Sequence, residues 1–229
     1  MKLNNIKDVF FDLDHTLWDF DKNSALTFKK IFELNNLEVP FNAFISRYEP
    51  INLKYWKLYR EEQIGKEALR LIRLNETFEA IGFKVDEHIV YKLSNDYITQ
   101  LTTFNYLFDD THEILTYLSS KYNLHIITNG FEEVQHKKLT KSNILEYFKT
   151  VTNSEMVGVK KPNPKIFNYA LENAYAKVNE SVMIGDSYEA DIMGAINVGM
   201  DVVLFDTKCI KVSKDIKQID KLNKLRLYL

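Results

Sequence analysis

The chain has 229 residues, of which 45% are hydrophobic and 27% are charged, and its formal net charge is -2 at pH 7. A chain of this length and composition is expected to bury one large core or two modest ones, which excludes wholesale disorder. The weak net charge gives no reason to expect a nucleic acid polymer or an anionic membrane as a partner. No stretch approaches the ~18 apolar residues of a membrane helix, and the first residues lack the pattern of a signal peptide, so we expect a cytoplasmic protein.

A single cysteine, Cys209, excludes an intrachain disulfide. Its neighbours Lys208, Ile210 and Lys211 suggest no set of metal ligands, so we interpret it as a structural or incidental thiol. The oligomeric state stays open, either a monomer or a homodimer.

The first element is an apolar run over residues 9–11 that ends in Asp12 and Asp14. Apolar, β-rich residues that end in charge predict a buried strand whose carboxyl end opens into a site. Both carboxylates are within reach of one cation or one reacting group, whether the chain stays extended or turns after Asp12. An isolated Asp-x-Asp is more often a solvated turn, so the later motifs decide between the two interpretations.

The next stretch, residues 20–104, has helical patterns and no convincing strand. Helices are predicted from about residue 25 and over residues 41–48, 52–62, 66–81 and 86–100, with turn signals at Pro40, Pro50, Gly65 and Gly82. We therefore expect residues 20–104 to form a helical cap domain, inserted into a core domain of residues 1–19 and 105–229.

From residue 109 onward, helix and strand alternate. Helices are predicted over residues 109–121, 131–142, 164–176 and 188–197, and strands over residues 124–128, 150–152, 182–184 and 201–205. Such alternation favours a parallel sheet, because parallel strands need crossover connections that helices supply. The predicted fold class is α/β, a Rossmann-like parallel sheet with helices on both faces and an inserted all-α cap domain.

Polar residues also follow the second predicted strand. Thr128 can donate to a phosphate oxygen, and Asn129 and Gly130 can offer backbone N–H groups near the start of a helix. Alone, this pattern is equally typical of an ordinary strand-to-helix turn.

Two further motifs carry charge. Lys160 and Lys161 precede Pro162 and a predicted helix, where lysines are more often surface charge than reactive groups. Asp186 follows the strand at residues 182–184, and Asp191 lies five residues later, early in the next helix, so both can point back to the strand ends.

In this order, the motifs resemble the four motifs of the haloacid dehalogenase-like hydrolases, most of which are phosphatases, and the resemblance covers nearly the whole chain. It selects Lys161 over Lys160, although the family more usually has a small residue at the position of Lys160. It implies that Asp12 attacks phosphorus to form an aspartyl-phosphate and that Asp14 protonates the leaving oxygen and then deprotonates water. The implied phosphate-binding groups are Thr128, Asn129, Gly130 and Lys161.

The resemblance also implies a Mg²⁺ site formed by Asp12, the Asp14 carbonyl and Asp186, with Asp191 supporting the metal or the lysine. Clustered carboxylates without a cation raise the electrostatic free energy of the folded protein, since like charges at ~4 Å repel by several kcal/mol at intermediate dielectric. A dehalogenase attacks carbon and needs neither magnesium nor a second acid two positions on, so Asp14 favours phosphoryl transfer.

Within the family, several stretches resemble a bacterial pyrimidine 5′-nucleotidase group, which implies a nucleoside monophosphate as the small-molecule partner. They are residues 16–21, residues 56–59 with Gly65 and 69–73, residues 127–131 with Gln135, and residues 154–162. A nucleobase needs an apolar face to stack on. Aromatic residues at the positions of Trp56 and Tyr59 are more often core residues of the cap, and a histidine such as His15 is more often a loop residue. Arg73 is expected to pair with Glu76 or Glu79 on its own helix rather than to touch substrate. The candidate substrate contacts are His15, Trp18, Phe20, Trp56 and Tyr59.

Two other functions stay open. One is a sugar-phosphate phosphatase or phosphomutase of the same superfamily, and the other is a regulator that binds a phosphorylated ligand without turnover. Intact acids at positions 12, 14, 186 and 191 argue against the regulator. A 2-haloacid dehalogenase is disfavoured by Asp14.

Overall fold

The computed structural model describes residues 2–207 and 210–229, so Cys209 lies outside the described residues. The chain forms two compact units, one of Met1–Phe20 with Asn105–Leu229 and the other of Asp21–Phe104. We call them the core unit and the helical unit. Phe20, which we predicted as the first residue of the cap, belongs to the core unit. No helix within the described ranges is long and apolar enough to cross a membrane.

The core unit is built on a six-stranded sheet in which every neighbouring pair is parallel, with the strand order β3-β2-β1-β4-β5-β6. Its first strand, β1, pairs with both β2 and β4, so that Phe10 lies between His125 and Met183. This arrangement confirms the predicted parallel α/β sheet. The strands are β1 (Asp8–Phe11), β2 (Asn123–Thr128), β3 (Phe148–Asn153), β4 (Ser181–Gly185), β5 (Asp201–Phe205) and β6 (Lys217–Ile219).

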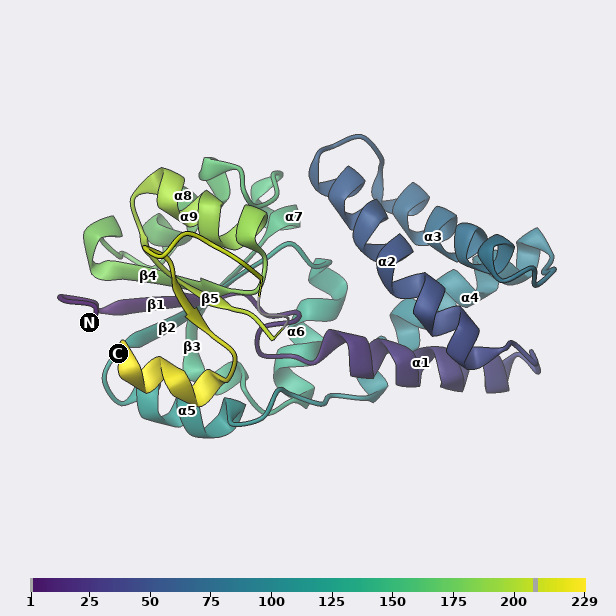
Figure 1. Ribbon diagram of the computed structural model, residues 1–229, viewed down its shortest axis with the longest axis horizontal. Coiled ribbons are helices and arrows are strands. Elements are labelled where there is room, and N and C mark those ends of the chain that lie inside the picture. Colours follow the sequence, from purple (N-terminus) through teal and green to yellow (C-terminus); the bar gives the residue numbers. More distant parts are fainter. Residues whose placement is uncertain (1, 208–209) are drawn as a thin grey trace. The chain divides into compact units, whose positions relative to one another are not determined.

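Helices cover both faces of this sheet (Figure 1). The chain moves outward from β1 to β3, returns to the other side of β1 and moves outward again from β4 to β6. Right-handed crossovers therefore place α8 (Pro164–Asn173) and α9 (Gly194–Val198) on one face, and α5 (Thr111–Ser119) and α6 (Glu132–Lys141) on the other. The other short helices of this unit are η2 (Leu145–Tyr147), α7 (Ser154–Val157), η3 (Val178–Glu180), η4 (Tyr188–Met193, a π-helix) and η5 (Leu222–Leu227).

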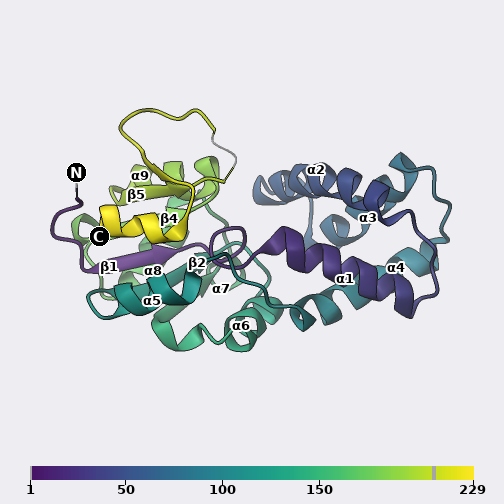
Figure 2. The ribbon, with the colours of Figure 1, turned by 60° about the horizontal axis from the view of Figure 1, so that its bottom comes forward.

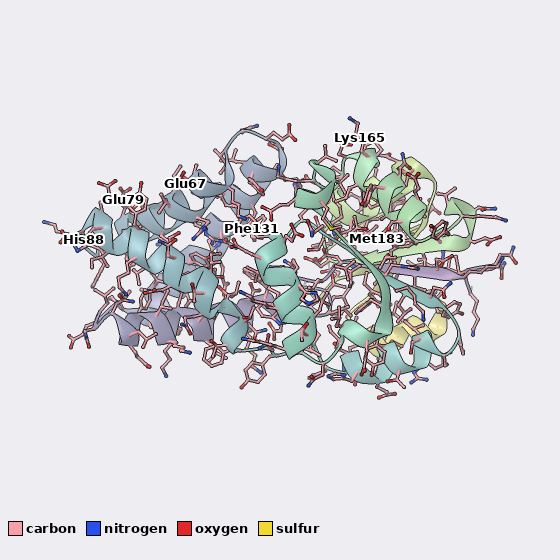
Figure 3. The ribbon with its side chains drawn as sticks, turned by 180° about the vertical axis from the view of Figure 1, so that it is seen from behind. Glu67, Glu79, His88, Phe131, Lys165 and Met183 are labelled. Atoms are coloured by element: carbon pink, nitrogen blue, oxygen red, sulfur yellow. The ribbon has the colours of Figure 1, made fainter. Side chains whose placement is uncertain are left out.

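The strand order reverses beside β1, and this reversal positions the site. In open α/β sheets, ligands bind beyond the carboxyl ends of the strands at such a switch point. Beneath it, Phe10 and Met183 belong to a buried cluster with Phe167 of α8 and Ala195 of α9. Figure 3 labels Met183, which lies in the middle of β4 and two residues before its carboxyl end. The rigid sheet therefore fixes the loops that follow β1, β2 and β4.

The helical unit has an aromatic core and consists of α1 (Phe20–Leu34, of which Phe20 belongs to the core unit), α2 (Phe41–Arg60), α3 (Lys66–Ala80), α4 (Glu87–Gln100) and η1 (Leu101–Thr103). The ring of Phe28 lies 4.9, 4.5 and 4.7 Å from the rings of Phe44, Tyr48 and Tyr97, measured between centroids. Helices α2 and α3 lie side by side (Figures 1 and 2).

The helix α2 differs from the prediction. We expected two helices separated near Pro50, but one helix runs from Phe41 to Arg60 with Pro50 inside it. A proline removes one backbone donor and normally kinks or ends a helix. Here Tyr48 and Asn52 on either side of Pro50 are both buried, so packing holds the two halves in one helix.

The partner of Arg73 was also predicted incorrectly. Its guanidinium is buried and donates to Asn52 Oδ1 at 2.7 Å, and it lies 5.2 Å from the Tyr97 ring centroid. Glu76 instead accepts from Lys54 at 2.8 Å. Helical spacing alone cannot reveal that an arginine points into the bundle rather than along its own helix.

Candidate functional site

The polar residues identified from the sequence lie where the three central strands end. Asp12 follows β1, Thr128 is the last residue of β2, and Asp186 follows Gly185 at the end of β4. The Asp12 backbone N–H donates to Ile184 O at 2.9 Å, so the chain is still in register with β4 at this point. Parallel strands bring these three ends to one edge of the sheet, between the covering helices (Figure 1).

Three carboxylates meet at this edge. One carboxylate oxygen each from Asp12, Asp186 and Asp191 lies within 4.8 Å of the others. Asp12 and Asp191 are buried and Asp186 is half-buried. Asp191 packs against Gly185, where an added Cβ would overlap the Asp191 carboxylate, so the close approach requires glycine. Asp191, predicted only to support the site, thus belongs to the same cluster of carboxylate oxygens as the predicted ligand Asp186.

Two hydrogen bonds orient these carboxylates. Asp191 Oδ2 accepts from the backbone N–H of Ser187 at 3.0 Å, at the start of η4. Asp186 Oδ1 accepts from the Thr16 hydroxyl, which lies 3.4 Å away in the loop after β1. Each acid is therefore held by the loop of a different strand.

Lys161 provides a buried positive charge for two of the three acids. Its Nζ lies 2.6 Å from Asp12 Oδ1 and 2.6 Å from Asp191 Oδ1, and it donates to Ile127 O at 2.6 Å. Its side chain is only 2% exposed. Burial alone would lower the pKa of Lys161, but the Asp12 and Asp191 carboxylates outweigh burial and raise that pKa above its usual range, so the ammonium stays charged.

When all three acids are ionised, one lysine does not balance their negative charge. Burial raises the pKa of Asp12 well above its usual range, against the opposing effect of Lys161. Burial and the neighbouring Asp191 carboxylate raise the pKa of Asp186 to about 8. Hard divalent cations prefer carboxylate oxygens. The donor set and its shortage of positive charge therefore fit such a cation, which Asp12, Asp186 and Asp191 could hold.

The loop after β2 is tied to the loop that carries Lys161. The Asn129 side chain donates to Lys161 O at 3.0 Å and accepts from Lys161 N at 2.7 Å. We predicted only a role for the Asn129 backbone, and the sequence holds no specific signal for its side-chain role. The side chain of Asn129 thus positions the backbone from which Lys161 reaches the acids.

Thr128 and Gly130 are also linked. Gly130 N–H, which we expected to face a phosphate, donates to Thr128 Oγ1 at 3.1 Å. Because that bond uses Thr128 Oγ1 as the acceptor, the hydroxyl hydrogen of Thr128 remains to be donated elsewhere. The Gly130 N–H therefore faces Thr128 and not a phosphate site, which corrects our expectation for Gly130. Donation from the Thr128 hydroxyl to a phosphate oxygen stays a prediction.

The Asp14 carboxylate has partners that we did not predict as functional. Asp14 Oδ1 lies 2.5 Å from Lys138 Nζ, and Asp14 Oδ2 accepts from Gln135 Nε2 at 2.9 Å. Lys138 and Gln135 are buried on α6, and burial lowers the pKa of Lys138 while Asp14 opposes that shift. Their spacing of three residues on one helix was the available signal, because such residues share a face.

The aromatic residues proposed as substrate contacts pack against other side chains of the protein. Trp18 is fully buried and Phe20 is 6% exposed, so neither ring has a free face for a nucleobase in this structure, which corrects that prediction. His15 is a loop residue with a φ of 64°. In the helical unit, the rings of Trp56 and Tyr59 pack edge to face, with centroids 5.7 Å apart, as expected for core aromatics of the cap.

Comparisons with known proteins agree with this architecture. The family profile described as haloacid dehalogenase-like hydrolase matches residues 9–205. The chain is 32% identical over 194 residues to the pyrimidine 5′-nucleotidase YjjG of Escherichia coli strain K12, covering 84% of this chain and 82% of YjjG. It is 33% identical over 215 residues to the glyceraldehyde 3-phosphate phosphatase of Pyrococcus furiosus, covering 89% of this chain and 82% of that phosphatase.

A solved structure is similar over almost the whole chain. The HAD-hydrolase YfnB of Bacillus subtilis, in a crystal structure bound to magnesium, superposes with a TM-score of 0.87 at 27% identity and covers 97% of each chain. The similarity therefore extends over the sheet, its covering helices and the inserted helices.

Proposed function

Because the chain belongs to the haloacid dehalogenase-like hydrolases, we propose that it is a magnesium-dependent phosphatase that hydrolyses a phosphomonoester through an aspartyl-phosphate on Asp12. The observation that carries this proposal is the cluster of three carboxylates around Lys161, which is short of positive charge. A cation that offsets this charge lets a carboxylate approach an anionic phosphate. Attack on a neutral haloacid carbon does not need that compensation at the reacting centre.

In the proposed first step, an Asp12 carboxylate oxygen attacks phosphorus and the bond from phosphorus to the leaving oxygen breaks. Lys161 holds the Asp12 carboxylate in place through Oδ1 and stabilises negative charge in the transition state. Thr128 and the backbone of Asn129 support the phosphate oxygens. Magnesium bound by Asp12, the Asp14 carbonyl and Asp186, with Asp191 beside them, would offset the repulsion between Asp12 and the phosphate.

Asp14 carries the proton in both halves of the proposed reaction. In its protonated form it gives a proton to the leaving oxygen, so that a neutral alcohol departs. The resulting Asp14 carboxylate then accepts a proton from water as that water attacks phosphorus. Cleavage of the bond between phosphorus and Asp12 releases inorganic phosphate and restores both acids.

For the substrate, we propose a nucleoside 5′-monophosphate, with pyrimidine nucleotides preferred. The support is the similarity to the Escherichia coli pyrimidine 5′-nucleotidase, together with the run 127–131 and Gln135 in the sequence. A sugar phosphate is the second candidate, because the similarity to the Pyrococcus furiosus phosphatase is just as high.

A screen of phosphate release with magnesium present tests both levels of this proposal. The substrates are pyrimidine and purine nucleoside monophosphates and a set of sugar phosphates that includes glyceraldehyde 3-phosphate. We expect the highest kcat/KM with a pyrimidine nucleotide. If a sugar phosphate exceeds every nucleotide by a large factor in kcat/KM, the nucleotidase proposal fails while the phosphatase proposal stands. Absence of phosphate release from every substrate contradicts both.

Magnesium is expected to stabilise the fold more strongly at high pH. The pKa of Asp186 in the folded protein, about 8, exceeds its ordinary value of 3.8, so between these pH values the folded state binds a proton that the unfolded state does not. Without magnesium, stability therefore falls as the pH rises from about 4 to about 8. A cation must displace this proton, so its affinity rises over the same range.

Thermal unfolding in magnesium and in EDTA, measured at several pH values, checks this expectation. The difference in Tm should be several degrees above about pH 8 and close to zero near pH 5. Asp186→Asn removes the titrating carboxylate and should flatten the pH dependence. A difference in Tm that is absent, or equal at every pH, contradicts the assignment of the cation site.

A further inference from the structure

The Asp14 carboxylate is clamped by two side chains from one helix. Its Oδ1 is 2.5 Å from Lys138 Nζ and its Oδ2 is 2.9 Å from Gln135 Nε2, so each oxygen accepts from its own donor. Lys138 and Gln135 are each 2% exposed. The helix α6 that carries them begins after Phe131, which Figure 3 labels. Both donors are therefore shielded from water, whereas the Asp14 side chain is 19% exposed.

The packing around the two donors restricts their positions. Lys138 Nζ lies 4.3 Å from the Trp18 ring centroid and 5.4 Å from that of Phe20, so the ammonium contacts two aromatic rings as well as Asp14. The Gln135 amide lies directly against Gly130, where an added Cβ would overlap it. Both donors are thus held by contacts in addition to those with the Asp14 carboxylate.

The site therefore has one lysine for each of two acids with different proposed tasks. Lys161 holds Asp12, the proposed nucleophile, whereas Lys138 holds Asp14, the proposed proton donor and acceptor. A mobile carboxylate transfers a proton poorly, because misplacement by about 1 Å can cost about 10²-fold in rate. The family motifs include Lys161 but leave the buried charge of Lys138 unexplained.

We propose that Lys138, together with Gln135, is a positioning residue that fixes the Asp14 carboxylate for proton exchange with the leaving oxygen. This inference rests on the proposed phosphatase function. It predicts that loss of the clamp harms a reaction in proportion to its need for a proton on the leaving group. A 4-nitrophenolate leaves readily without a proton, whereas the 5′-alkoxide of a nucleoside does not.

The test compares kcat/KM for 4-nitrophenyl phosphate, phenyl phosphate and a nucleoside 5′-monophosphate, because kcat/KM reports the steps up to departure of the leaving group. For Lys138→Met we expect a loss of about 10²-fold or more with the nucleotide, within the range of general acid catalysis, and a loss below about tenfold with 4-nitrophenyl phosphate. Gln135→Met should show the same trend with smaller losses. Lys137→Met, at the exposed neighbouring position of α6, should leave all three values unchanged.

A double variant distinguishes positioning from simple support of the fold. Asp14→Asn should show the same dependence on the leaving group, and adding Lys138→Met to it should cause little further loss, because both changes remove one function. An equal loss with all three substrates, no loss, or additive losses in the double variant overturns the inference. If Lys138→Met does not fold, Gln135→Met decides by the same criterion. These outcomes require that the wild type hydrolyses the substrates, and failure of the wild type contradicts the proposed function instead.

Discussion

Replacing Asp12 with asparagine is expected to abolish phosphate release from a generic aryl phosphate, with a loss on the order of 10⁴-fold or more in kcat. An amide is not a nucleophile toward phosphorus, so no aspartyl-phosphate can form. The fold should persist, since asparagine keeps an oxygen that can accept from Lys161 Nζ, which lies 2.6 Å from Asp12 Oδ1. Removing one of three clustered carboxylates also lowers their mutual repulsion, so without magnesium the Tm should not fall by more than a few degrees.

Steady-state kinetics and thermal unfolding check this expectation together. Asp201→Asn is a matched control, because Asp201 is an exposed aspartate at the amino end of β5, on the opposite edge of the sheet. It should change neither turnover nor Tm. Normal turnover by Asp12→Asn rules out Asp12 as the nucleophile.

Replacing Lys161 with methionine is expected to lower both activity and stability. The substitution leaves Asp12 and Asp191 without the ammonium that lies 2.6 Å from each. Removing one partner of a buried ion pair typically costs about 3–5 kcal/mol in the free energy of unfolding, because a buried charge loses its compensation. The same ammonium is proposed to stabilise the transition state, so we expect kcat to fall by about 10³-fold.

Denaturant unfolding and phosphate release measure these two effects. Lys160→Met tests the choice between adjacent lysines and should have an effect at least about tenfold smaller on kcat. Magnesium should restore part of the stability lost in Lys161→Met, since a cation compensates the same carboxylates. A Lys161→Met variant as stable and as active as the wild type contradicts the assignment of Lys161.

The fold class could be predicted from the sequence because it depends on local periodicity. Alternating helix and strand patterns after residue 109 predicted the parallel sheet, which the structure and the family comparison confirm. The three-residue strand β6 was not predicted, because so short a segment carries no detectable period. The continuity of α2 through Pro50 depends on burial of its neighbours, which local signals do not encode.

The candidate site was partly predictable for a similar reason. Asp12 and Asp186 each follow a strand, and parallel strands bring their carboxyl ends to one edge, so the structure places both acids together. The partners of Asp14 depend on which face of α6 turns toward the loop after β1. That choice is made by packing of Lys138 against Trp18, a contact between distant segments that no local pattern reveals.

The most direct test of the phosphatase proposal is a comparison of two product assays on the wild-type protein. One assay measures phosphate release from phenyl phosphate in magnesium and in EDTA, and the other measures chloride release from 2-chloropropionate in EDTA. We predict phosphate release that depends on magnesium and no release of chloride. Chloride release without magnesium, with no phosphate release in its presence, contradicts the proposal that Asp12 attacks phosphorus.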